Sequence, residues 1–170
     1  SSRFRQGEAS LEAYGRLLGR LEAVSIAYVL RALAALGMKL VLAQRFATDS
    51  LAERLGVPGR NRRLLERLLE MLAEERILCD LDGCWEVARM PRNVDPSEQV
   101  RHLLAEHPEA AAELTLLDRC GSALSRVLRG ECDPLELLAP DGDLSLLERL
   151  YQDSPGATAM NRLLRDAVQT

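Results

Sequence analysis

The sequence predicts a mostly α-helical fold, in which a winged-helix-like helix-turn-helix with a short β-hairpin is followed by a helical subdomain. Hydrophobic residues make up 47% of the 170-residue chain but aromatic residues only 4%, so Leu, Ala and Val must build the core. That composition is typical of helix-on-helix packing. Apolar residues recur at three- and four-residue steps along several segments, as in amphipathic helices. Asp82-Gly83, a dipeptide that favours a type I′ turn, separates two short strand-like runs.

The first predicted helix is long and enters the core. Its apolar side chains follow helical spacing: Leu11, Tyr14, Leu18, Leu21, Val24 and Tyr28. Residues 24–42 are long enough and apolar enough to suggest a membrane span, but Arg31 near the middle favours a buried core helix. Gly37 predicts the end of this helix.

A helix-turn-helix is predicted next. Ser50 and Glu53 resemble a capping box, so residues 51–55 are expected to form a short helix that ends at Gly56. The following helix presents leucines at helical spacing: Leu64, Leu65, Leu68, Leu69 and Leu72. This order of elements is the first part of a winged helix.

Residues 77–81 and 84–87 are the two predicted strands of the wing. Pairing Leu81 with Cys84 across the turn places four side chains on one face of the hairpin: Leu78, Asp80, Trp85 and Val87. We expect Trp85 to pack on the preceding helix as an ordinary core residue.

Residues 91–96 look like a linker, which divides the chain into a winged-helix-like half at 1–90 and a helical half at 97–170. Ser97 is the expected cap of a helix that ends near Pro108, and a longer helix then runs to Gly130. Shorter helices are expected at 134–138 and 144–151. Ser154-Pro155 predicts the start of a final helix that is still running at Val168, so we expect the polypeptide to continue.

The sequence offers little chemistry of its own. It has no glycine-rich strand-to-helix turn for a dinucleotide or S-adenosylmethionine and no phosphate loop, so we expect no cofactor in this chain. His102 and His107 lie about 140° apart on a helix and do not converge. Cys79 and Cys84 lack a second pair of ligands at zinc spacing. We therefore expect neither a metal site nor catalysis here.

A winged helix can bind DNA, and the second helix of the motif carries four arginines: Arg60, Arg62, Arg63 and Arg67. The same helix carries Glu66, Glu70 and Glu74, and the net charge of the chain is −4. A solvated face with local ion pairs is the better interpretation. A DNA-binding regulator remains the alternative, while neither nucleic acid nor a membrane is an expected partner. Because no secretory leader is evident, the cytoplasm is the expected location.

Two stretches of the second half resemble a known family. One combines residues 116–121 (LLDRCG), 128–131 (LRGE) and 133–138 (DPLELL). The other combines residues 150–155 (LYQDSP) with 161–164 (NRLL) and 167–168 (AV). Both are similar to the segment that precedes the methyltransferase core in modular polyketide synthases. The resemblance covers roughly residues 114–168.

The resemblance implies that the chain is the lid region of a C-methyltransferase domain. In that family the lid covers a Rossmann-like core, absent here, that binds S-adenosylmethionine. Lid and core enclose a β-ketoacyl chain on the phosphopantetheine arm of an acyl carrier protein, and the α-carbon is methylated. The resemblance places the cofactor loop and the catalytic histidine and glutamate downstream of Thr170. A non-catalytic scaffold between synthase domains is a further alternative.

The resemblance also implies candidate residues for the substrate chamber: Tyr151, Asp153, Ser154, Met160 and Asn161. Met160 is the departure from the family, which often places a tyrosine just before the asparagine. Because a thioether cannot donate the tyrosine's hydrogen bond, the parent enzyme is expected to use another donor or to have altered activity. Ser154 is equally well explained as a helix cap.

Overall fold

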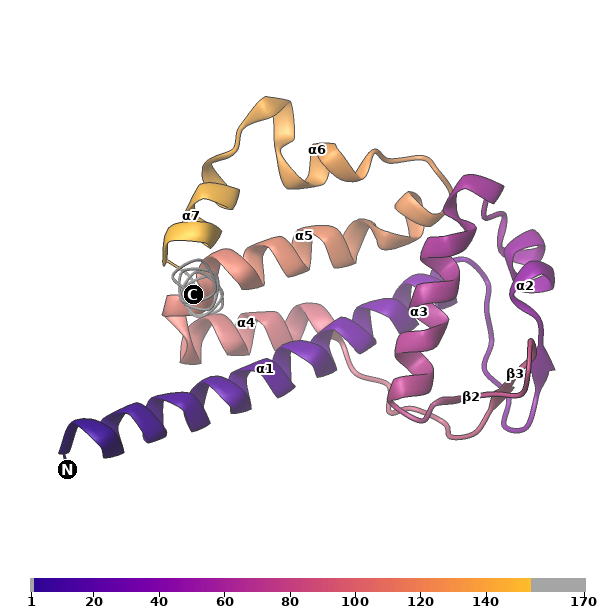
Figure 1. The fold of residues 1–170 in the computed structure, drawn as a ribbon. Coiled ribbons are helices and arrows are strands. Elements are labelled where there is room, and N and C mark those ends of the chain that lie inside the picture. Colours follow the sequence, from indigo (N-terminus) through magenta and orange to yellow (C-terminus); the bar gives the residue numbers. More distant parts are fainter. Residues whose placement is uncertain (1, 154–170) are drawn as a thin grey trace, which may run out of the picture.

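A computed structural model describes residues 2–153, and it is mostly helical, as the sequence predicts. The long helix α1 (Ser2–Ala35) runs along the whole molecule (Figure 1). At one end it meets α2 (Thr48–Leu55), α3 (Arg62–Glu74) and a small sheet. The helices α4 (Pro96–Glu106) and α5 (Ala111–Leu128) lie beside its middle, and α6 (Pro134–Leu138) and α7 (Ser145–Asp153) lie beyond α5.

The hairpin was predicted correctly, and the structure adds a third strand. β2 (Leu78–Asp80) and β3 (Trp85–Val87) are antiparallel, and positive φ angles of 51° at Asp82 and 91° at Gly83 form the type I′ turn. β1 (Arg45–Phe46) pairs with the other edge of β3, which gives the order β1-β3-β2. Sequence reasoning missed β1 because two residues are too few to show a strand pattern.

Two predicted helix starts were wrong. α2 begins at Thr48 and not at residue 51, so Ser50 lies inside the helix, and the N-cap Ala47 makes no side-chain bond. α4 is capped by Asp95, whose carboxylate accepts a hydrogen bond of 3.0 Å from the backbone N–H of Ser97. In each case the N-cap residue lies two or three positions before the predicted cap, and its extended backbone leads into the helix. The predicted ends at Gly37, Gly56 and Gly130 are confirmed by their positive φ angles.

Two apolar clusters form the core. The first joins α3 and the hairpin to the end of α1, and Leu65, Leu69 and Leu72 are fully buried in it. The second joins α1 to α4 and α5 around Tyr28 and Leu114. Leu128, from the end of α5, is buried in the first cluster. Hence α1 and α5 both tie the winged half to the helical half.

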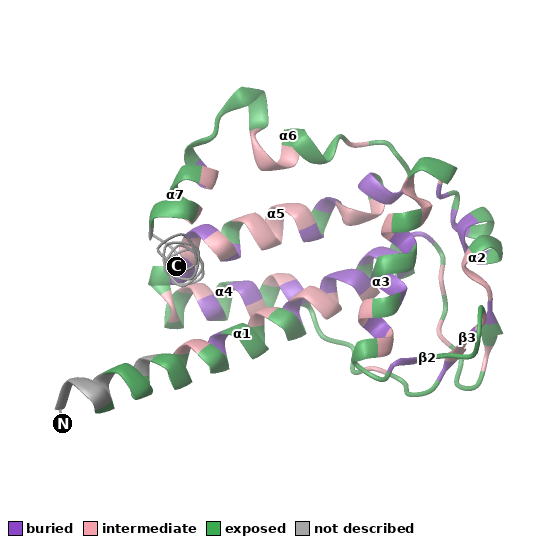
Figure 2. Ribbon diagram, viewed as in Figure 1, coloured by how far each residue is buried: buried purple, intermediate pink, exposed green. Residues whose placement is uncertain are grey.

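Exposure rises away from this core (Figure 2). The N-terminal turns of α1 are mostly exposed, and so are much of α6 and α7. Among the helices of residues 2–153, none has both the length and the hydrophobicity that a bilayer crossing requires.

Candidate functional site

The structure leaves most of the predicted chamber residues untested. Tyr151 lies on α7 with 66% of its surface exposed. Asp153 ends that helix, but its side chain lies outside the described residues, as do Ser154, Met160 and Asn161. The predicted final helix after Ser154 lies outside them as well. Two other regions have side-chain contacts that the structure describes. One is residues 116–121, which belong to the first stretch that resembles the family, and the other is the segment before α4.

Asp118 and Gly121 both contact Tyr28. The Tyr28 hydroxyl donates a short hydrogen bond to Asp118 Oδ1, and Ser122 Oγ donates to the same oxygen at 3.4 Å. Gly121 faces the Tyr28 ring so closely that a Cβ at this position would lie 2.7 Å from Cδ2 and nearer still to Cγ. The aspartate and glycine of this stretch therefore seat a buried tyrosine from α1, which is a structural task.

Burial and the hydrogen bond to Asp118 raise the pKa of Tyr28 to about 12 from its ordinary value of 10.0. The folded state thus favours the neutral phenol. Its contribution to stability should be complete below pH 10 and should be lost as pH rises toward 12. We expect urea unfolding at a series of pH values to show this extra loss in the wild type and not in Tyr28→Phe. An identical pH dependence in the two proteins would contradict it.

Arg31 binds three elements together. Its guanidinium donates to Ser97 Oγ at 3.0 Å and to Ser122 Oγ at 3.2 Å, and it lies 3.6 Å from Asp95 Oδ1. The same group stacks over the Tyr28 ring, 4.9 Å from its centre. The charge that interrupts the apolar run of the first helix is therefore used to fix the start of α4 against α1 and α5. Sequence analysis used Arg31 only to exclude a membrane span, although a lone arginine in a core helix signals nearby acceptors.

The stretch 133–138 also has a local structural role. Asp133 caps α6 by accepting a hydrogen bond of 3.0 Å from Leu135 N, and Pro134 occupies the first turn. Arg119 of α5 donates to Leu137 O at 3.1 Å, which fastens α6 across α5. Burial raises the pKa of the neighbouring Cys120 thiol, so it is a poor nucleophile.

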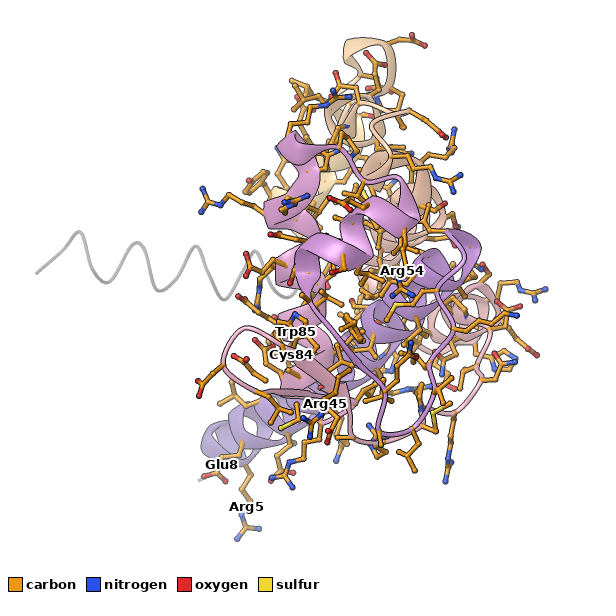
Figure 3. The ribbon with its side chains drawn as sticks, turned by 90° about the vertical axis from the view of Figure 1, so that its right-hand side faces the viewer. Arg5, Glu8, Arg45, Arg54, Cys84 and Trp85 are labelled. Atoms are coloured by element: carbon orange, nitrogen blue, oxygen red, sulfur yellow. The ribbon has the colours of Figure 1, made fainter. Side chains whose placement is uncertain are left out.

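Carboxylates line the face that a winged helix would turn to DNA, which lies beside the hairpin residue Trp85 labelled in Figure 3. A hollow of about 350 Å³ between α2, α3 and the hairpin is lined by four carboxylates, those of Asp49, Glu66, Glu70 and Asp80. Arg62 pairs with Asp49 at 2.9 Å, and Arg67 pairs with Glu74 at 2.8 Å and with Glu70 at 3.1 Å. Arg60 lies 3.5 Å from the carbonyl of Gly130. A surface of this kind repels a phosphate backbone.

The indole of Trp85 belongs to the fold of this wing. Its ring is buried in the first core cluster, as predicted, and its Nε1 donates to Thr48 Oγ1 at 2.9 Å. Within residues 2–153, His, Cys, Asp and Glu side chains form no group of three that could hold a metal ion.

An apolar groove lies between α1 and residues 89–95, the segment that joins β3 to α4 and that we name the strap. Three adjoining hollows of about 590, 240 and 190 Å³ share Leu30 as their floor. Ala27 and Ala34 of α1 widen the floor, and Val94 and Arg92 of the strap form the rim. Sequence analysis treated residues 91–96 as a linker and did not find this apolar depression.

Comparisons with known proteins connect this fold to a family. A non-reducing polyketide synthase of Preussia isomera, Preu3, is 30% identical over 147 residues, and one of Emericella nidulans, pkbA, is 32% identical over 144 residues. The solved structure of the CurJ carbon methyltransferase matches 93% of this chain with a TM-score of 0.85 and 39% identity. The chain is related to the carbon methyltransferase domains of polyketide synthases. No protein-family model matches it.

Two further solved structures share the fold of this methyltransferase-domain region. The DszA carbon methyltransferase covers 94% of the chain with a TM-score of 0.74 and 23% identity. The citrinin polyketide synthase CMeT domain covers 84% with a TM-score of 0.71 and 22% identity. The chain spans 42%, 40% and 37% of the three structures, and 6% of each of the two fungal synthases. It thus corresponds to one part of a carbon methyltransferase domain.

Proposed function

We propose that the chain is the lid of an S-adenosylmethionine-dependent C-methyltransferase domain in a polyketide synthase. In this proposal residues 1–90 and 97–170 are the two halves of the lid, and a Rossmann-like core in the same polypeptide binds the cofactor. The lid helps to enclose a β-ketoacyl chain on the phosphopantetheine arm of an acyl carrier protein while its α-carbon is methylated.

The observation that carries the proposal is the match to the CurJ carbon methyltransferase, which covers 93% of this chain but only 42% of that structure. A region that makes up less than half of such a domain, and whose sequence has no glycine-rich cofactor loop, suits a cover better than a catalytic core. Closing a site excludes water, which strengthens electrostatic stabilisation of an enolate.

Large apolar side chains are exposed on the proposed lid, and they could be buried against the Rossmann-like methyltransferase core. Leu135 on α6 is 70% exposed and Leu144 before α7 is 51% exposed, and both helices lie beyond α5 (Figure 1). Patches of this kind mark surfaces that another body covers. We propose that Tyr151, Asp153, Ser154, Met160 and Asn161 line the substrate chamber.

The proposal is tested with the parent domain, expressed with the lid and with residues 1–153 deleted. Methyl transfer from S-adenosylmethionine to a β-ketoacyl carrier protein is measured by mass spectrometry. We expect cofactor binding by the core to persist and methyl transfer to fall by roughly 100-fold or more when the lid is removed. Undiminished transfer by a folded core that lacks the lid would overturn the proposal.

A further inference from the structure

We propose that the strap groove binds the acyl-phosphopantetheine arm of a carrier protein. This inference rests on the proposed function and adds the place at which the lid itself recognises the arm. The arm combines an apolar acyl chain, two amide groups and one phosphate. The groove offers a matching surface for each of these three parts.

The first part is an apolar floor of suitable length. The hollows follow one side of α1 from Ala23 through Leu30 to Ala34, 12 residues that span about 17 Å at 1.5 Å per residue, and they reach Met38 beyond the end of the helix. Met90 and Val94 of the strap are 50% and 39% exposed, so the strap does not close over the floor. An extended chain can therefore lie in the groove and bury apolar surface on both sides.

The second part is an unused acceptor. Gln99, on the first turn of α4, lines the same groove, and its side-chain oxygen is buried with no hydrogen-bond partner among residues 2–153. Such a group is costly, because burial removes its water and nothing replaces it. An amide N–H of the arm would supply the missing donor.

The third part is positive charge at the rim. Arg31, Arg89 and Arg92 line the groove, against the carboxylates of Glu75 and Asp95. Arg31 is held by Asp95, Ser97 and Ser122, and Arg89 donates to Glu75 O at 2.9 Å. Arg92 is exposed and has no hydrogen-bond or ion-pair partner within the described residues. It is therefore the cation available for a phosphate.

The alternative occupants fit less well. Free fatty acid would satisfy the floor and Arg92 but not the Gln99 acceptor, since it has no amide. A peptide segment with basic side chains would place positive charge beside Arg92, which would repel it. The arm is the ligand that uses all three features together.

Two probes and two pairs of variants test the proposal on the 170-residue chain. The probes are octanoyl-phosphopantetheine and octanoyl-pantetheine, and dissociation constants are measured by titration calorimetry. Ala34 and Ala35 are both exposed near the end of α1, but only Ala34 lines the groove. We expect Ala34→Trp to block binding of both probes and Ala35→Trp to leave it unchanged.

The charge pair separates the phosphate from the rest of the arm. Arg92→Gln should weaken the phosphorylated probe by about fivefold and leave the other unchanged, whereas Arg54→Gln on α2 should affect neither. Gln99→Met should weaken both probes by about fivefold. Equal affinities in Ala34→Trp and Ala35→Trp, or no binding of either probe to the wild type, would overturn the inference. Because the lid-deletion experiment measures methyl transfer and not binding to this chain, it can succeed when this one fails.

Discussion

Gly121→Ala is expected to lower the free energy of unfolding by about 2 kcal/mol, although alanine is the better helix former. The added Cβ would lie 2.7 Å from Cδ2 of Tyr28, well inside van der Waals contact. The ring has little freedom to retreat. It is 1% exposed, its hydroxyl is bonded to Asp118, and Arg31 stacks on it. The clash must therefore push α5 away from α1.

Gly19→Ala is the matched control, since this glycine is also inside a helix but a Cβ there would meet nothing within 4 Å. It should raise stability by up to about 1 kcal/mol. Urea unfolding followed by circular dichroism measures both variants. In a Tyr28→Ala background, Gly121→Ala should lose most of its cost, because the ring it strikes is gone. If Gly121→Ala were as stable as Gly19→Ala, the packing described for Tyr28 would be wrong.

The elements that were predicted correctly are those encoded within a few neighbouring residues. The Asp82-Gly83 turn with its flanking strands and the leucine spacing of α3 are local patterns, and local patterns can be recognised in a single sequence. The start of α2 was missed because Ser50 and Glu53 match a capping box without making one. A motif of that length recurs by chance, and only backbone geometry shows where a helix begins.

The roles of the recognised residues could not be predicted in the same way. Asp118 and Gly121 belong to a stretch that resembles a family, but their partner Tyr28 lies 90 residues before Asp118 in the sequence. The strap groove was missed for a related reason, since a linker and a helix face make a groove only after the chain folds back. The resemblance to a family was visible in short runs of residues. The structural roles of those residues depend on contacts with distant parts of the chain, which no local pattern encodes.

A substitution at Leu128 tests whether the chain divides into two domains at residues 91–96. We expect the stability of the chain to be more sensitive to substitution here than at most other positions. This residue follows the linker in sequence but is 0% exposed inside the core of the winged half. Asn61 Nδ2 donates to the carbonyls of Val127 and Leu128 at 2.9 and 3.2 Å, and this reinforces the same junction. Leu128→Ala should therefore cost about 2–5 kcal/mol, because it leaves a cavity between the halves.

Leu135→Ala removes the same atoms from a side chain that is 70% exposed, so it should change stability by no more than about 0.5 kcal/mol. Trp85 is the only tryptophan in the chain, so its fluorescence reports on the winged half, while circular dichroism reports on all the helices. In Leu128→Ala we expect both signals to shift to lower urea together, since α1 and α5 belong to both cores. A shift of the fluorescence alone would mean that the halves unfold separately, and the linker would then be a true domain boundary. A common shift would mean that the two halves unfold as one cooperative unit.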